Sequence, residues 1–411
     1  MKLSISKKKL SLVCLLIPFF EPQFFQTIKW VHFAYKYWGY LTLLVLLVCF
    51  LGNQIKSRKI ESDKCTVVLL LYSLWLLASC FKNHTPISIY LSNYVPILGI
   101  SLIITIYGKD KLSDVVDAII ILTNMMIAIN FITVMVFPNG LYTHITEKGS
   151  DYYCWFLGYK NPQIRFFLPA IGFNFVSDYF RGKKISFRTC VIILMIILTE
   201  SKIDSSTSMV GLAVFVILYI VWRKKEKIRK YFEFFKLSYF YIAACVASVL
   251  VVFFNIQSKF SFLIENILHR NVGLTDRTII WARVVLAIKN NLIWGYGLQS
   301  GAASEYCISA THAHDYMLQI IYTSGVVGFI LISLLWIIAS HYCTVGFESP
   351  GIKMLMLCSA AILVMGITEA LTEAPLIYPM LILMAELTLW TKGKENNDNT
   401  SVKQKNKETG I

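Results

Sequence analysis

Apolar runs of about 20 residues recur along most of this chain of 411 residues, and they restrict its possible folds more than any other feature. A run of that length crosses the hydrocarbon core of a bilayer as one α-helix. Only 15% of the residues are charged, whereas soluble domains carry roughly 25%. The alternating segments of about 10 residues that mark a membrane β-barrel are absent. The sequence therefore predicts an all-α, polytopic membrane protein.

The twelve expected spans run at about residues 10–27, 35–52, 65–81, 87–107, 113–137, 164–180, 187–203, 207–222, 237–256, 316–340, 353–371 and 376–391. The first span is interrupted by Pro18, Glu21 and Pro22. Its basic start and apolar run are similar to a signal peptide, but no small-residue cleavage site follows. We therefore expect it to be retained as a membrane helix.

Most of the 39 Lys and Arg residues fall on one side of these spans. They lie at both chain ends and in four loops, at residues 54–64, 108–111, 181–188 and 223–236. Positive residues concentrate on the cytoplasmic side of membrane proteins. We therefore expect a protein of the cytoplasmic membrane with both termini inside the cell.

This topology predicts four parts of the chain. Residues 1–256 form nine spans with short loops, and residues 257–315 form a long extracytoplasmic loop with an amphipathic helix. Residues 316–391 form the last three spans, and the polar segment 392–411 is expected to be a disordered cytoplasmic tail.

Charge and cysteine content bear on two other classes of function. The net charge of +15 could indicate nucleic-acid binding, but its distribution over short loops favours membrane orientation and no nucleic-acid partner. The ten cysteines lie mostly in apolar spans, without C-x-x-C or metal-ligand spacing. Cys154 and Cys307 both fall in expected outer loops and could pair.

The chemically distinctive stretch is residues 273–329, in and after the long outer loop. Between Thr275 and Asn291, apolar residues repeat at intervals of three and four, which predicts an amphipathic helix at the outer interface. Arg277 and Arg283 lie on this helix. They could extend to lipid headgroups, or at least one could bind a phosphate, because guanidinium matches phosphate oxygens with a planar fork of donors.

Two further patterns follow the helix. Gly295 and Gly297 flank Tyr296 and indicate a turn rather than a phosphate cradle. His312 and His314 are two apart, so they would not share a helical face and a helical metal pair is not expected. The histidines could form a solvated structural pair, or one could act as a general base near neutral pH, with Asp315 orienting it.

The order R-x-x-x-W, G-x-G and H-x-H-D-Y-x-L-Q-x-x-Y-x-x-G-x-x-G resembles the signature of the O-antigen polymerase and O-antigen ligase family. The residues concerned are Arg277, Trp281, Gly295, Gly297, His312, His314, Asp315, Tyr316, Leu318, Gln319, Tyr322, Gly325 and Gly328. Residues 157–161 also resemble the G-x-K-N motif of Gram-positive capsule polymerases. Residues 198–211 resemble a segment in which family members usually carry Arg, where this chain offers Lys202 or Thr207.

This resemblance implies polymerisation of polyprenyl-diphosphate-linked oligosaccharide repeat units into a surface polysaccharide of the capsule or O-antigen type. The reaction would be a metal-independent, inverting glycosyl transfer on the outer face of the membrane, with no cofactor. His314 would be the catalytic base, and Arg277 would bind the diphosphate. The substrate-binding residues would be Arg283, His312, Lys202, Lys160, Asn161 and Asp315. Membrane lipids, a chain-length regulator and a flippase are the other expected partners.

Three alternatives differ in what the sequence should contain. An O-antigen ligase would transfer finished polymer to an outer-membrane lipid core, so it needs a Gram-negative host. A transporter or flippase should carry charges deep in several spans and show internal repeats. A sensor or structural membrane protein would not need the combination of Arg277 and His314. Acidic residues near outer helix ends include Glu369 and Glu373, and we expect Glu369 to have a supporting role.

Overall fold

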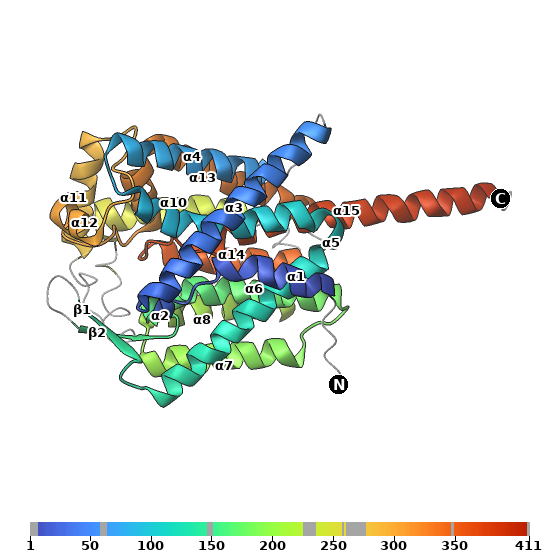
Figure 1. The fold of residues 1–411 in the computed structure, drawn as a ribbon, viewed down its shortest axis with the longest axis horizontal. Helices are drawn as coiled ribbons and strands as arrows, with labels where there is room; N and C mark the ends of the chain where they lie inside the picture. Colours follow the sequence, from blue (N-terminus) through green and yellow to red (C-terminus); the bar gives the residue numbers. More distant parts are fainter. Residues whose placement is uncertain are drawn as a thin grey trace.

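The computed structural model describes residues 7–57, 64–145, 151–224, 236–256, 259, 277–346 and 349–408. They form a bundle of long helices with a small sheet at one end (Figure 1). The helices before the midpoint of the chain are α1 (Lys7–Leu16), α2 (Gln23–Gln26), α3 (Lys29–Ser57), α4 (Lys64–Lys82), α5 (Ile87–Val136), α6 (Ile164–Phe180) and α7 (Phe187–Ile203). The later helices are α8 (Ser206–Lys224), α10 (Leu237–Phe254), α11 (Arg277–Asn290), α12 (Gly301–Ile308), α13 (Tyr316–Val345), α14 (Pro350–Gly366) and α15 (Ile377–Glu408).

Within the described ranges, six helices are long and apolar enough to cross a membrane, namely α3, α4, α5, α8, α10 and α13. The helices α6, α7 and α14 are shorter, with 17 residues each. The all-α membrane fold is thus confirmed, while the number of twelve spans stays a prediction.

Two stretches depart from the regular spans that the sequence predicts. The region of the first expected span is divided into α1, a 3₁₀ helix (Ile17–Phe19) and α2, and the extended backbone at Pro22 separates the last two. The spans expected at 87–107 and 113–137 form the single element α5, which is broken at Lys111. The two segments of α5 meet at an angle in Figure 1.

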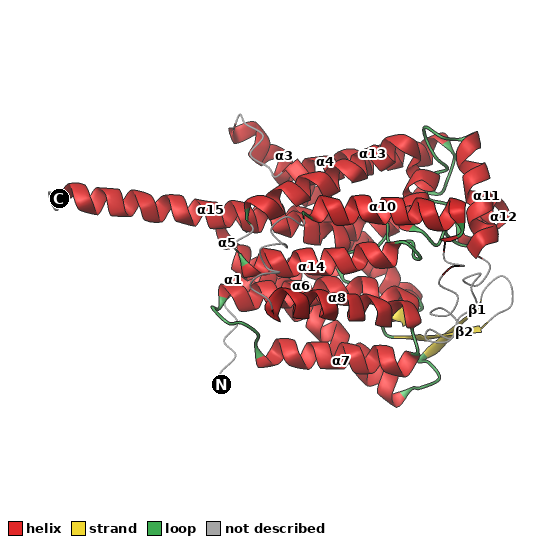
Figure 2. Ribbon diagram, turned by 180° about the vertical axis from the view of Figure 1, so that it is seen from behind, coloured by secondary structure: helices red, strands yellow, loops and turns green. Residues whose placement is uncertain are grey.

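The ends of the bundle differ in structure. At one end, β1 (Tyr142–Ile145), β2 (Asp151–Trp155) and β3 (Gly158–Tyr159) form an antiparallel sheet in the order β1-β2-β3. At the other end, α15 extends away from the bundle to Glu408 (Figure 2), through most of the segment for which the sequence predicts a disordered tail.

The core is built around α14 and the first part of α15, which other helices enclose. Residues 351–363 of α14 and 377–388 of α15 are all buried. The first helix packs against α6 and α8, and the second against α5 and α13. A helix that is apolar on every side is stable only when protein or lipid surrounds it, and here protein does.

Helix α13 is broken at Gly325, and the segment after α11 fills the break. Gly325 has φ of 65° and ψ of −171°, so the regular backbone hydrogen bonds stop there. The amides of Tyr296 and Gly297 donate to the carbonyls of Tyr322 and Thr323, each at 2.8 Å. The amide of Val326, beyond the break, donates to the Leu292 carbonyl at 2.8 Å. The predicted Gly-rich turn is therefore a structural turn joined to α13.

Helix α4 holds the same junction from the other side. The Trp75 indole donates to the Ser324 carbonyl at 2.7 Å, and its ring stacks on Trp294 at 4.3 Å between centroids. Ser79 Oγ donates to the Trp294 carbonyl at 2.7 Å, and Asn83 donates to the Gly295 carbonyl at 2.9 Å. Most of the polar groups released by the break are thus satisfied by side chains and backbone close in space.

We expect Gly325→Ala to lower the melting temperature of the purified protein in detergent. An added Cβ would lie 2.0 Å from the Ile293 carbonyl oxygen, and the positive φ disfavours any side chain, at a cost of about 1–3 kcal/mol. Gly52→Ala is the matched control, because no atom lies within 4 Å of that Cβ position. Equal melting temperatures for the two variants would contradict the packing of residues 291–297 on α13.

Candidate active site

Helices α11 and α12 lie at one end of the bundle (Figure 2). Four segments meet there: α11, the loop 309–315 before α13, the loop 367–376 after α14, and the start of α6. The first two lie in the predicted long outer loop. The last two come from other parts of the chain.

Helix α11 confirms the predicted amphipathic pattern from Arg277 onwards, while Thr275 lies outside the described residues. Ile280, Trp281 and Val284 are buried in a small apolar cluster with residues of α12 and α13. The Trp281 indole donates to the Ala313 carbonyl at 3.1 Å. The apolar face of α11 thus fixes the residue that lies between the two histidines.

His312 and His314 lie side by side, with 4.0 Å between ring centroids. The backbone amide of His314 donates to His312 Nδ1 at 3.3 Å, which leaves the proton of a neutral His312 on Nε2. His314 has φ of 50°, an uncommon value for a residue with a side chain. Its Nδ1 atom has no hydrogen-bond partner among the described residues. This buried imidazole nitrogen therefore has unused hydrogen-bonding capacity.

Burial and nearby arginines keep both histidines neutral. Burial, followed by the charges of Arg165 and Arg277, lowers the pKa of His312 to about 4. Burial, followed by His312 and Arg277, lowers the pKa of His314 to about 2. At neutral pH both rings are therefore uncharged.

Arg277 is held by a carboxylate from the loop after α14. Its Nη2 atom lies 3.1 Å from Glu369 Oε1, and both side chains are largely buried. Burial raises the pKa of Glu369, an effect that the charges of Arg277 and Arg165 oppose. The supporting role expected for Glu369 is thus a direct ion pair with the predicted phosphate ligand.

Arg165 is a second cation at this site that the sequence reading missed. Its Nε donates to the Pro162 carbonyl at 3.3 Å, and Glu373 and Glu369 are the acidic groups that act on its charge. Within the described part of the chain it has no ion pair within 4.0 Å, unlike Arg277. An arginine at the start of an apolar span was the available signal, because charge at the edge of a membrane helix is seldom incidental.

The motif at residues 157–161 positions the start of α6. Buried Gln163 donates to the Gly158 carbonyl at 3.0 Å and accepts from Asn130 at 2.8 Å. Asn130 also accepts from the Leu157 amide at 2.9 Å. These bonds fix the turn that leads to Arg165, which gives this motif a structural role.

The two weaker motifs meet in space. Lys160 Nζ donates to the Asp204 carbonyl at 3.1 Å, and Asn161 accepts from Ser205 Oγ at 3.2 Å. Both bonds join the turn before α6 to the turn between α7 and α8. Lys202, beside that turn, is exposed. Lys160 and Asn161 therefore make structural contacts in this state, and no interaction of Lys202 identifies it as a phosphate ligand.

Asp315 and Arg283 have other partners than the sequence suggests. The Asp315 carboxylate accepts from the Leu318 amide at 2.8 Å and from Ser248 Oγ, so it caps α13 and ties it to α10. Arg283 is exposed and donates to Ser309 Oγ, whereas Arg165 and Arg277 are the arginines that act on His312.

The two cysteines of the outer segments, Cys154 and Cys307, are both free thiols. The first is buried in β2 and the second is partly exposed in α12. The pairing considered from the sequence is therefore absent from this structure.

Residues 189–333 match the family model described as O-antigen ligase. The match includes Arg277, His312 and His314, and it excludes Arg165 and Glu369. No curated protein matches this chain. The family match confirms the resemblance found in the sequence and supports an activity of the O-antigen ligase or polymerase type, which implies membrane glycosyl transfer from lipid-linked oligosaccharides.

We expect Arg277→Ala and Glu369→Ala each to destabilise the protein. Removing one partner of a largely buried ion pair leaves an uncompensated charge, at a cost of about 3–5 kcal/mol. The double variant Arg277→Leu/Glu369→Leu should recover most of the lost melting temperature. Arg283→Ala, on the same helix but exposed, should change the melting temperature little. If the double variant is as unstable as the sum of the single variants, the two side chains are not coupled.

Proposed function

We propose that this protein polymerises polyprenyl-diphosphate-linked oligosaccharide repeat units on the outer face of the cytoplasmic membrane. The observation that carries the proposal is the convergence of two arginines and an imidazole nitrogen without a partner at one end of a membrane bundle. The O-antigen ligase match over residues 189–333 supports it, because that segment contributes Arg277 and His314.

Arg165 and Arg277 are the groups suited to the diphosphate of the donor. A guanidinium donates two parallel hydrogen bonds to phosphate oxygens and keeps its charge on partial burial. Arg165 is available without breaking an ion pair among the described residues. Arg277 is paired with Glu369 at 3.1 Å, so it must break this ion pair to bind the phosphate.

His314 is the proposed general base. The acceptor hydroxyl gives its proton to Nδ1 of His314, the buried nitrogen without a partner among the described residues, while its oxygen attacks the anomeric carbon of the donor. The bond from that carbon to the diphosphate oxygen breaks, and its electron pair leaves with the lipid diphosphate. Attack opposite the leaving group inverts the anomeric configuration. His312 fixes the backbone of the base through the 3.3 Å bond to its amide.

The same electrostatics would let substrate binding strengthen the base. In the free protein, burial and positive charge keep the pKa of His314 near 2, which disfavours proton uptake. A bound diphosphate would offset the charges of Arg165 and Arg277, so the imidazolium would become easier to form. The proton transfer is then coupled to donor occupancy.

A metal-based alternative rests on a specific cluster. Ligand atoms of His312, His314 and Glu369 lie within 4.8 Å of one another, which is compatible with a metal ion. The sequence spacing did not anticipate Glu369 as a third ligand. Arg277 already pairs with that carboxylate, and a divalent cation would meet two arginine charges. We therefore infer that the arginines supply the positive charge in this reaction.

We expect glycosyl transfer by the purified protein to survive EDTA in vitro. The diphosphate is stabilised by Arg165 and Arg277 in this proposal, so chelation removes no catalytic group. Glycosyl transfer from a lipid-diphosphate donor, followed by product chain length, is the measurement. Loss of activity with EDTA and recovery with a divalent cation would support the His312, His314 and Glu369 cluster as a metal centre instead.

We expect His314→Ala and Arg165→Ala to prevent formation of long glycan chains. Loss of one electrostatic or proton-transfer group typically costs a factor of about 10²–10⁴ in rate. Each variant would be returned to a deletion strain, with surface polysaccharide separated on a gel and membrane protein level measured by blot. Arg283→Ala is the matched control and should restore a full ladder.

The deletion strain also separates polymerase from ligase. A product with a single repeat unit indicates a polymerase, whereas long chains that are not attached to their lipid acceptor indicate a ligase. The similarity of residues 157–161 to capsule polymerases favours the first result. A full ladder from both His314→Ala and Arg165→Ala, at normal protein level, would rule out the proposed site.

A further inference from the structure

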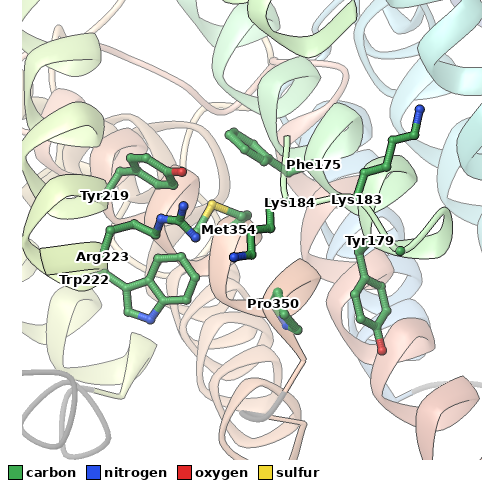
Figure 3. Close-up of a pocket in the computed structure, with 10 residues that line it drawn as sticks. Phe175, Tyr179, Lys183, Lys184, Tyr219, Trp222, Arg223, Pro350 and Met354 are labelled. Carbon is green, nitrogen blue, oxygen red and sulfur yellow. The ribbon is translucent and has the colours of Figure 1, made fainter. Parts of the chain in front are cut away.

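A second site of distinctive chemistry lies at the opposite end of the bundle. A pocket of about 370 Å³ opens between the ends of α6 and α8 and the start of α14 (Figure 3). Its lining includes three basic residues, Lys183, Lys184 and Arg223, and the aromatic residues Tyr219 and Trp222. This volume lies within the range of about 300–1,000 Å³ that is typical of ligand pockets.

The helices place this pocket across the membrane from the histidines. Helix α6 begins next to Arg165 and ends at Phe180, one turn before the pocket lysines. Helix α14 runs the other way, from Pro350 at the pocket towards the loop that holds Glu369. Each helix has 17 residues, or about 26 Å at 1.5 Å per residue, close to the bilayer hydrocarbon thickness. The pocket therefore lies at the second membrane interface.

Two basic residues of the pocket lack the acidic partners that nearby arginines have. Arg181 pairs with Asp117 at 2.9 Å, and Arg188 pairs with Asp178 at 3.0 Å. Among the described residues, no acidic residue lines the pocket, and Lys184 and Arg223 have no ion pair. These two basic groups are therefore suited to bind an anion.

One aromatic residue, Tyr219, orients the Arg223 guanidinium. The Arg223 guanidinium lies over the Tyr219 ring, 5.9 Å from its centroid. In Figure 3 the Arg223 and Lys184 head groups are turned towards the pocket, whereas the Lys183 side chain extends away. Trp222 Nε1 is buried without an acceptor among the described residues. A phosphate could satisfy the charges of Lys184 and Arg223.

We propose that this pocket binds the phosphate headgroup of an anionic phospholipid. Basic pockets between membrane helices on the cytoplasmic side bind such headgroups, and Tyr and Trp concentrate at the same depth. Below the pocket, α8 exposes Val216, Ile217 and Ile220, an apolar surface along which acyl chains can lie. This surface favours a lipid over a free phosphate. The inference is independent of the reaction at the other end.

The test compares lipid binding by the full-length protein and two double variants. The protein would be purified in detergent and titrated separately with phosphatidylglycerol and with phosphatidylcholine. Native mass spectrometry would measure how much of each lipid is bound. The pocket variant is Lys184→Gln/Arg223→Gln. The control is Lys8→Gln/Lys56→Gln, which removes two exposed positive charges outside the pocket. Melting temperature verifies that each variant is folded.

We expect the pocket variant to bind phosphatidylglycerol on the order of tenfold more weakly, because each basic residue near an anionic lipid surface contributes several-fold. The control should bind as the wild type does, and phosphatidylcholine affinity should not change. Equal phosphatidylglycerol affinity in the wild type and the pocket variant would overturn the proposal. Inorganic phosphate that displaces the lipid at equal concentration would also overturn it, in favour of a free phosphate.

Discussion

The break in α13 at Gly325 imposes the constraint on which the end of the bundle that carries α11 and α12 depends. Inside a bilayer, a backbone group that loses its helical partner must find another, since water is not available. The segment 292–297 and α4 supply those partners. The cost of interrupting a membrane helix is thereby offset by joining an extramembrane segment to it. Because α11 and α12 are continuous with that segment, the loop that carries His312 and His314 is fixed relative to the bundle.

The site combines charges that would be unfavourable separately. Arg165 and Arg277 approach two neutral histidines, and Glu369 and Glu373 moderate the resulting positive potential. A partly buried arginine without a carboxylate nearby would be costly, and a carboxylate without an arginine would tend to take up a proton. The cluster can therefore remain charged at a membrane boundary. In the proposed reaction, Arg165 is in place before substrate binds, whereas Arg277 must first leave Glu369.

Local sequence patterns were sufficient for the class of fold and for part of the site. The apolar face of α11, the turn at Gly295 and the histidine pair could all be predicted, because each depends on residues close in the chain. Arg165 and the pairing of Arg277 with Glu369 could not, since they depend on contacts between distant segments. The sequence suggested that Asp315 could orient a histidine, because the two are adjacent in the chain. In the structure Asp315 instead caps the N-terminus of α13. The weak motifs at 157–161 and 198–211 are far apart in the chain, and only the structure shows that their turns are hydrogen-bonded to each other.

Helix α14 is almost fully enclosed by protein, so it can link the two ends of the bundle without also having to match the thickness of the bilayer. A helix that faces lipid must match the hydrocarbon thickness or tilt, thin the bilayer or deform. Helix α14 has protein on almost all sides, so its 17 residues are free of that requirement. Hydrophobic matching instead concerns the peripheral helices, such as α3 and α10, which expose apolar side chains. Changes in bilayer thickness should therefore be absorbed at the perimeter, while the distance between the two ends of α14 stays constant.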